Sequence, residues 1–159
     1  MEAGVAYFED TLKQYNGKVG FGIDADMALT ENLGIFARYS WNDDKSESFG
    51  YTECQQSINA GFLLNMKFIY RDGDKFGLAA SYGTLSKDHQ NYLKNGGEGF
   101  MLGDGNLNYA PEIVGETFYS FNVFENLALT FNYQYAMNAG YNKDRGNTSF
   151  YSFRFNLSF

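Results

Sequence analysis

His89 is the one histidine of the 159-residue chain, and it lies between Asp88 and Gln90, three residues after Ser86. Hydrolases build an activated nucleophile from a serine and a histidine. No nucleophile motif and no suitably spaced acid–base partner accompany this pair, so a catalytic triad is not supported. We therefore predict a solvated loop histidine and a protein that is not an enzyme.

Oxygen-rich side chains gather at Gly103-Asp104-Gly105, which is followed by Asn106 and Asn108. Carboxylate and amide oxygens are typical calcium ligands, but the segment lacks the EF-hand spacing and its terminal glutamate. Asp and Gly are equally typical of plain turns. The single cysteine, Cys54, provides neither a disulfide framework nor a cysteine-based metal site. We predict a turn here, with no metal and no cofactor.

Alternation of apolar and polar residues organises most of the chain. In the last segment, residues 148–159, Phe153, Phe155 and Phe159 fall on one face and Arg154 and Asn156 on the other, because side chains in a strand have a period of two. The same period predicts seven further strands, at 3–8, 19–28, 33–41, 58–68, 76–83, 113–124 and 127–137. A short helix is a further expectation within 86–95.

The composition favours strands that lie in a membrane. Aromatic residues make up 19% of the chain although the mean hydropathy is -0.41, as expected when lipid-facing residues alternate with polar ones. No stretch approaches the ~20 apolar residues of a transmembrane helix. The net charge of -7 argues against a nucleic-acid partner. A soluble β-sheet rich in ordinary β-formers is the alternative.

The connections between the predicted strands are alternately short and long. Short turns fall near 30–32, 71–74 and 124–126, and long connections near 9–17, 43–55, 85–112 and 138–147. Outer-membrane barrels have short periplasmic turns and long extracellular loops. A final strand ending in phenylalanine, here Phe159, resembles the assembly signal of bacterial outer-membrane proteins. We expect an all-β, transmembrane antiparallel β-barrel of about eight strands in the outer membrane of a Gram-negative-type bacterium, in contact with its lipids and able to form a homo-oligomer.

A glycine-rich segment gives a more specific resemblance. Residues 96–105, Gly-Gly-Glu-Gly-Phe-Met-Leu-Gly-Asp-Gly, are similar to the segment that precedes the last strands of carbohydrate-selective porins of the OprB type. The closing motifs at 116–119, 132–135 and 138–146 and the earlier strand at 33–41 also resemble that family. Ala139 departs from the pattern, which commonly has proline there.

The resemblance implies a sixteen-stranded barrel, of which this chain would supply the C-terminal half. Eight strands alone close around side chains, whereas sixteen leave an aqueous channel. Glycines on the proposed interior face leave space, which suits a wide pore: Gly20, Gly22, Gly34, Gly61, Gly77 and Gly83. Residues 1–159 are therefore expected to form one β-barrel domain or part of one, and an independently closed small barrel remains the alternative.

The interior face then determines function. Sugars are rich in hydroxyls and apolar on their ring faces, so a selective lumen should combine charged hydrogen-bonding groups with aromatic rings. The predicted lumen residues are the cations Arg38, Lys67 and Arg154, the carboxylates Asp24, Asp26 and Glu116, and the rings Phe36 and Phe118. The charges could instead pair with one another across the lumen, and the rings could pack locally under a loop.

Two functions follow. The first is a porin for passive, carbohydrate-selective diffusion of small sugars, with ions also passing. The second is a small structural or adhesion barrel without a conducting lumen.

Overall fold

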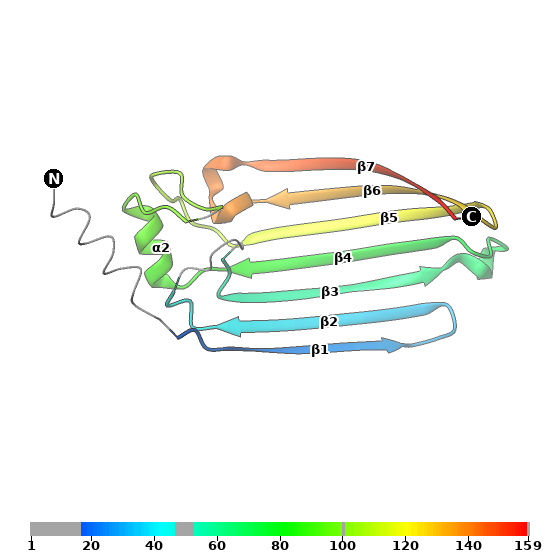
Figure 1. The fold of residues 1–159 in the computed structure, drawn as a ribbon, viewed down its shortest axis with the longest axis horizontal. Helices are drawn as coiled ribbons and strands as arrows, with labels where there is room; N and C mark the ends of the chain where they lie inside the picture. Colours follow the sequence, from blue (N-terminus) through cyan, green and yellow to red (C-terminus); the bar gives the residue numbers. More distant parts are fainter. Residues whose placement is uncertain (1–16, 47–52, 100, 159) are drawn as a thin grey trace.

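The structure is a computed structural model that describes residues 17–46, 53–99 and 101–158. Within these residues, seven strands form a single antiparallel sheet in which each strand pairs with the next along the chain (Figure 1). The two outer strands do not pair with each other, so the sheet is open. This arrangement confirms the all-β antiparallel fold expected from the sequence.

The strands are 9 to 13 residues long. They are β1 (Gly20–Ala28), β2 (Leu33–Asn42), β3 (Gln56–Asn65), β4 (Lys75–Thr84), β5 (Glu112–Phe124), β6 (Leu127–Met137) and β7 (Asn147–Leu157). One α-helix, α2 (Lys87–Lys94), lies in the β4–β5 connection, and three short 3-10 helices complete the described elements: η1 (Met66–Ile69), η2 (Ala139–Tyr141) and η3 (Lys143–Arg145). Within the described ranges, no helix is long and apolar enough to cross a membrane.

The pairing register separates the side chains into two faces. On the apolar face, Phe131 of β6 lies opposite Tyr119 of β5 and Phe153 of β7. On the polar face, the next position in β6, Asn132, lies opposite Phe118 and Ser152. The phase is the one predicted from the sequence, because a one-residue slip would exchange the two faces.

The apolar face is exposed rather than packed against a second layer. Phe131 is 57% exposed, Phe153 56% and Ile23 64%. A water-soluble sheet would bury such a face against another element. A sheet whose apolar face meets lipid has no need of that second layer.

The connections are segregated to opposite ends of the sheet (Figure 1). The turns after β1, β3 and β5 lie at one end, which we call the short-turn end. The connections after β2, β4 and β6, together with α2, lie at the other, which we call the long-loop end. Ser86 caps α2, because its hydroxyl accepts a hydrogen bond from the backbone N–H of His89.

A small apolar core forms at the long-loop end. Leu85, Leu93, Leu102, Leu107 and Tyr141 are buried against one another there. The backbone reinforces this contact, since Ala110 N–H donates to the Tyr141 carbonyl and Lys143 N–H donates to the Asn108 carbonyl. The β4–β5 connection is therefore packed against the β6–β7 connection.

Two of the predicted strands differ in the structure. The strand expected at 3–8 lies outside the described residues. The strand expected at 58–68 ends at Asn65, and residues 66–69 form η1 instead. Apolar residues at 66 and 68 continued the alternation by chance, because Tyr70 takes the left-handed conformation that closes η1, with φ of 63°. The predicted extension to residue 68 is wrong.

Candidate functional site

The candidate site is the polar face of the sheet, where most of the residues singled out in the sequence lie on adjacent strands. On β1 and β2, Asp24 is directly opposite Arg38. The Arg38 Nε donates to the Asp24 Oδ1 at 2.8 Å, and both side chains remain more than half exposed. The guanidinium carbon of Arg38 also lies 5.8 Å from the centroid of the Phe36 ring. Asp24, Phe36 and Arg38 thus form one solvent-accessible group.

Glu116 on β5 is held by amide side chains from β6. The Asn132 Nδ2 donates to Glu116 Oε1, and the Gln134 Nε2 donates to Oε2 at 3.3 Å. Both donors lie on the polar face, and Gln134 is the cross-strand partner of Glu116. The carboxylate is therefore fixed in place without a salt bridge.

Arg154 lies further toward the short-turn end. It lines a hollow of about 240 Å³ together with Lys75, Glu116, Phe118 and Asn132. Within residues 17–46, 53–99 and 101–158, the side chain of Arg154 forms no hydrogen bond or ion pair. Its donors are thus available to a molecule in the hollow.

The two predicted rings occupy space that glycines vacate. A Cβ added to Gly61 on β3 would lie 2.7 Å from the Phe36 ring, and a Cβ added to Gly77 on β4 would overlap the Phe118 ring. Each ring therefore lies across a neighbouring strand. The expectation that these two glycines leave open space is wrong, since the rings fill it, and the rings pack against strands rather than under a loop.

Two other predicted residues have few contacts. Lys67 lies in η1 at the short-turn end, outside any strand, and is exposed. Asp26 lies on the polar face of β1 opposite Phe36, also exposed. Of the predicted set, Lys67 alone lies apart from the strands.

The predicted set of lumen residues omits several residues of this face. Lys75, Asn132 and Gln134 contribute to it directly, and Phe150 lies opposite Gln134 with 53% of its surface exposed. The period-two signal that identified Glu116 and Arg154 also covers all four. Three of them are uncharged, and Lys75 is the first residue of its strand, so they were less conspicuous than the charged residues within the strands.

The loops contain two charged contacts. His89 is 8% exposed in its side chain and is paired with Asp44 and Glu53, so the prediction of a solvated loop histidine is wrong. Asp104 receives two hydrogen bonds from Arg145 and one from Asn142, which occupy both carboxylate oxygens. Gly103 and Gly105 both have positive φ, as the predicted turn requires.

The fold has a close structural parallel. OprB from Pseudomonas putida, in a structure described as its high-pH form, superposes with a TM-score of 0.70 over 88% of this chain at 18% sequence identity. The matched region is 35% of the length of that protein, so this chain spans about a third of it. No curated protein matches the chain.

A family model carries the assignment further. The model described as carbohydrate-selective porin, OprB family, matches residues 6–159, nearly the whole chain. The match agrees with the open antiparallel sheet, its exposed apolar face and its segregated turns. The chain belongs to the OprB family of carbohydrate-selective porins.

Proposed function

We propose that the chain forms part of the wall of an outer-membrane channel through which small sugars diffuse passively. Its apolar face contacts lipid, and its polar face lines the lumen. The observation that carries the proposal is the separation of these faces across all seven described strands, with every charged side chain of these strands on one of them.

The polar face suits a neutral, hydroxyl-rich molecule. Arg38 and Arg154 supply guanidinium donors in a fork, and Glu116 and Asp24 supply acceptors. Phe36 and Phe118 lie across neighbouring strands and can contact an apolar sugar face. Lys67 and Asp26 contribute charge at the edges of this surface. Diffusion through such a lumen requires binding weak enough for release and needs no reacting group.

The two arginines are expected to differ. Arg38 is already committed to Asp24 through its Nε, whereas Arg154 has no partner among the described residues. Arg154 therefore offers its full set of donors to a passing sugar. Arg38 serves both as a sugar contact and as the partner that keeps Asp24 neutralised.

The test is conductance of the intact protein in a planar bilayer. Addition of a neutral sugar should lower the ionic current, because a bound sugar occupies space that ions would use. Loss of a hydrogen bond to a charged group is worth about 1.5–3 kcal/mol, so Arg154→Ala should weaken this block roughly tenfold or more. Arg38→Ala should weaken the block and also shift the current toward cations, because Asp24 is left unpaired.

The matched control is the double variant Asp24→Asn/Arg38→Ala, which removes both charges. Its ion preference should return toward that of the wild-type protein while its sugar block stays weak. If sugar block is unchanged in the Arg38 and Arg154 variants, the polar face does not bind sugar, although a general porin would stand. If the intact protein inserts but conducts nothing, the chain belongs to a structural barrel instead.

A further inference from the structure

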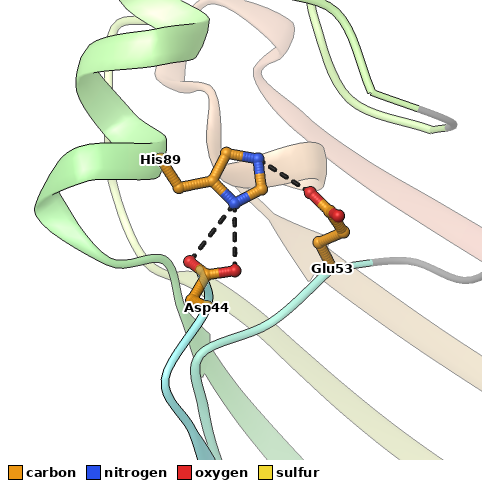
Figure 2. Close-up of side chains that lie close together, drawn as sticks. All are labelled: Asp44, Glu53 and His89. Carbon is orange, nitrogen blue, oxygen red and sulfur yellow. Dashed lines mark hydrogen bonds and ion pairs between the residues drawn. The ribbon is translucent and has the colours of Figure 1, made fainter. Parts of the chain in front are cut away.

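His89 bridges two carboxylates at the long-loop end. Its Nδ1 lies 3.1 Å from the Asp44 Oδ1 and 3.2 Å from the Oδ2, and its Nε2 lies 2.8 Å from the Glu53 Oε2 (Figure 2). His89 belongs to α2, whereas Asp44 and Glu53 belong to the β2–β3 connection. The contact therefore joins two connections that are adjacent in space and distant in sequence.

This contact is built into the backbone on both sides. Asp44 takes a left-handed conformation, with φ of 48°, and its N–H donates to the Asn42 Oδ1 at 2.9 Å. Its Oδ2 also accepts the Ser86 N–H at 3.0 Å, just before α2 begins. The Asp44 carboxylate thus contacts both the backbone N–H just before α2 and the ring of His89.

The geometry determines the charge of the ring. A neutral imidazole has one N–H donor, so one of its two nitrogens would direct a lone pair at a carboxylate. When both carboxylates are ionised, both contacts are satisfied at once only by the imidazolium. The Asp44 and Glu53 side chains are 1% and 3% exposed, which leaves little water to replace a lost partner.

Charges of both signs surround His89, and the two carboxylates that favour its imidazolium form contact the ring directly. Hydrogen bonding to Asp44 raises the pKa of His89 above its ordinary value, burial opposes this, and the charges of Asp44 and Glu53 add to the increase. Lys18, ahead of β1, lowers the pKa. The other charged groups lining this pocket are Asp43 and Lys45 of the β2–β3 connection and Asp88 of α2. The ring of Tyr92, also of α2, lies 6.4 Å from that of His89 and is tilted by 57°.

We do not interpret Asp44, Glu53 and His89 as a site for a divalent cation. The three side chains lie close enough together to suggest one. However, the ring offers Nδ1 to Asp44 and Nε2 to Glu53, and these nitrogens point in different directions. An ion bound to Nε2 and Glu53 would leave Asp44 bonded to Nδ1, which gives only two protein ligands, fewer than the three or four of ordinary zinc sites.

The other end of the β4–β5 connection is fastened differently. Arg145 donates to Asp104 through Nε at 2.8 Å and Nη2 at 2.7 Å, which ties this connection to the β6–β7 connection. Arginine keeps its charge at every physiological pH. Histidine changes its charge between about pH 5 and 8.

We propose that His89 is a pH-sensitive clasp: the imidazolium fastens α2 to the β2–β3 connection through both carboxylates, and its deprotonation breaks one of these two contacts and loosens that side while the Asp104–Arg145 contact holds the other. The clasp lies at the long-loop end of the sheet, between α2 and the β2–β3 connection. The proposal concerns the position of α2 and does not depend on whether the channel selects sugars.

The sign of the pH dependence follows from the direction of the shift. A group whose pKa is raised on folding stabilises the folded state fully below its unfolded value, about 6.5, and loses that contribution as the pH rises through the folded value. The clasp should therefore be closed at pH 6 and open as the pH rises through the folded pKa of His89, which lies above 6.5. Asp44 does not limit it at pH 6, because burial would raise its pKa but hydrogen bonds from His89 and Ser86 outweigh burial and lower it.

Two measurements on the intact protein in detergent micelles test the charge and the movement separately. Nitrogen-15 NMR of the histidine ring should show both nitrogens of His89 protonated at pH 6 and a pKa above 6.5, which Asp44→Asn should lower. Maleimide labelling of Cys54, the neighbour of Glu53, should report release. Cys54 is partly buried, and its Sγ donates to the Gln56 carbonyl at 2.9 Å.

Labelling rates are expressed as a ratio to those of the unfolded protein at the same pH. For the wild-type protein this ratio should rise several-fold between pH 6 and 9. For His89→Gln the ratio should be high and independent of pH, whereas for the control Arg145→Gln it should still rise with pH. A flat wild-type ratio, a normal rise in His89→Gln, or a ring that is neutral at pH 6 would each overturn the proposal.

Discussion

Arginine in place of Phe131 tests which face of the sheet meets lipid. Phe131 is the fifth of the eleven residues of β6, close to the middle of the strand and thus to the bilayer midplane. It is 57% exposed on the apolar face, and its ring lies 4.9 Å from that of Phe153. A charge placed there would face hydrocarbon.

The magnitude has two contributions. Arginine on the lipid face at the midplane of a barrel costs about 2–4 kcal/mol. Loss of the contact with Phe153 adds on the order of 0.5–1.5 kcal/mol. The free energy of unfolding should therefore fall by about 2.5–5.5 kcal/mol, and Phe131→Ala isolates the second contribution.

The assay is an equilibrium folding titration of the intact protein in denaturant with lipid vesicles, followed by electrophoretic mobility. The matched control is Asn132→Arg, one residue further along β6, where the guanidinium would lie beside Glu116 on the polar face. That variant should stay within about 1 kcal/mol of wild type. Equal costs at positions 131 and 132 would refute our assignment of the two faces.

Two further substitutions test contacts described above. Gly77→Ala should lower the free energy of unfolding by about 1–3 kcal/mol in the same titration, because the new Cβ overlaps Phe118. The double variant Gly77→Ala/Phe118→Ala should recover much of this loss, and no loss in Gly77→Ala would contradict the ring position. Asp74→Asn should cost about 1.5–3 kcal/mol at pH 7, because Asp74 accepts hydrogen bonds from the Arg71 Nε and the Asn122 N–H. Burial would raise the pKa of Asp74, but these bonds outweigh it and lower the pKa, so the difference from wild type should shrink as the pH falls below 3.8; a constant difference would show that the charge is not involved.

The strands and their facing could be predicted because a period of two is written directly into the sequence. Leu127–Met137 shows this well, since the predicted and observed bounds of β6 coincide. The same pattern misled at residues 66–68, where alternating residue types continued after the backbone had turned into η1. Periodicity reports residue types and does not report the φ of Tyr70 that ends the run.

The contacts between segments that are distant in the chain could not be predicted from the sequence. His89 and Asp44 are 45 residues apart, and nothing near either residue specifies the other. The register that lays Phe36 across Gly61 depends on how β2 and β3 align, which one strand alone does not determine. Alternation placed the predicted charges on the polar face, except Lys67, which lies outside the strands, whereas the partners of these charges depend on the folded arrangement.

The open edges of the sheet have a consequence for how the protein enters a membrane. Within the described residues, nothing pairs with the outer edge of β1 or of β7. Hydrocarbon offers no hydrogen-bonding partner, and each unsatisfied backbone group there costs several kcal/mol. If the strands inserted one at a time, every stage would expose such an edge to hydrocarbon. Insertion in which neighbouring strands pair as they enter the membrane is therefore favoured. The rate of insertion should therefore depend steeply on bilayer thickness, since a thinner membrane leaves fewer backbone groups exposed at each unpaired edge.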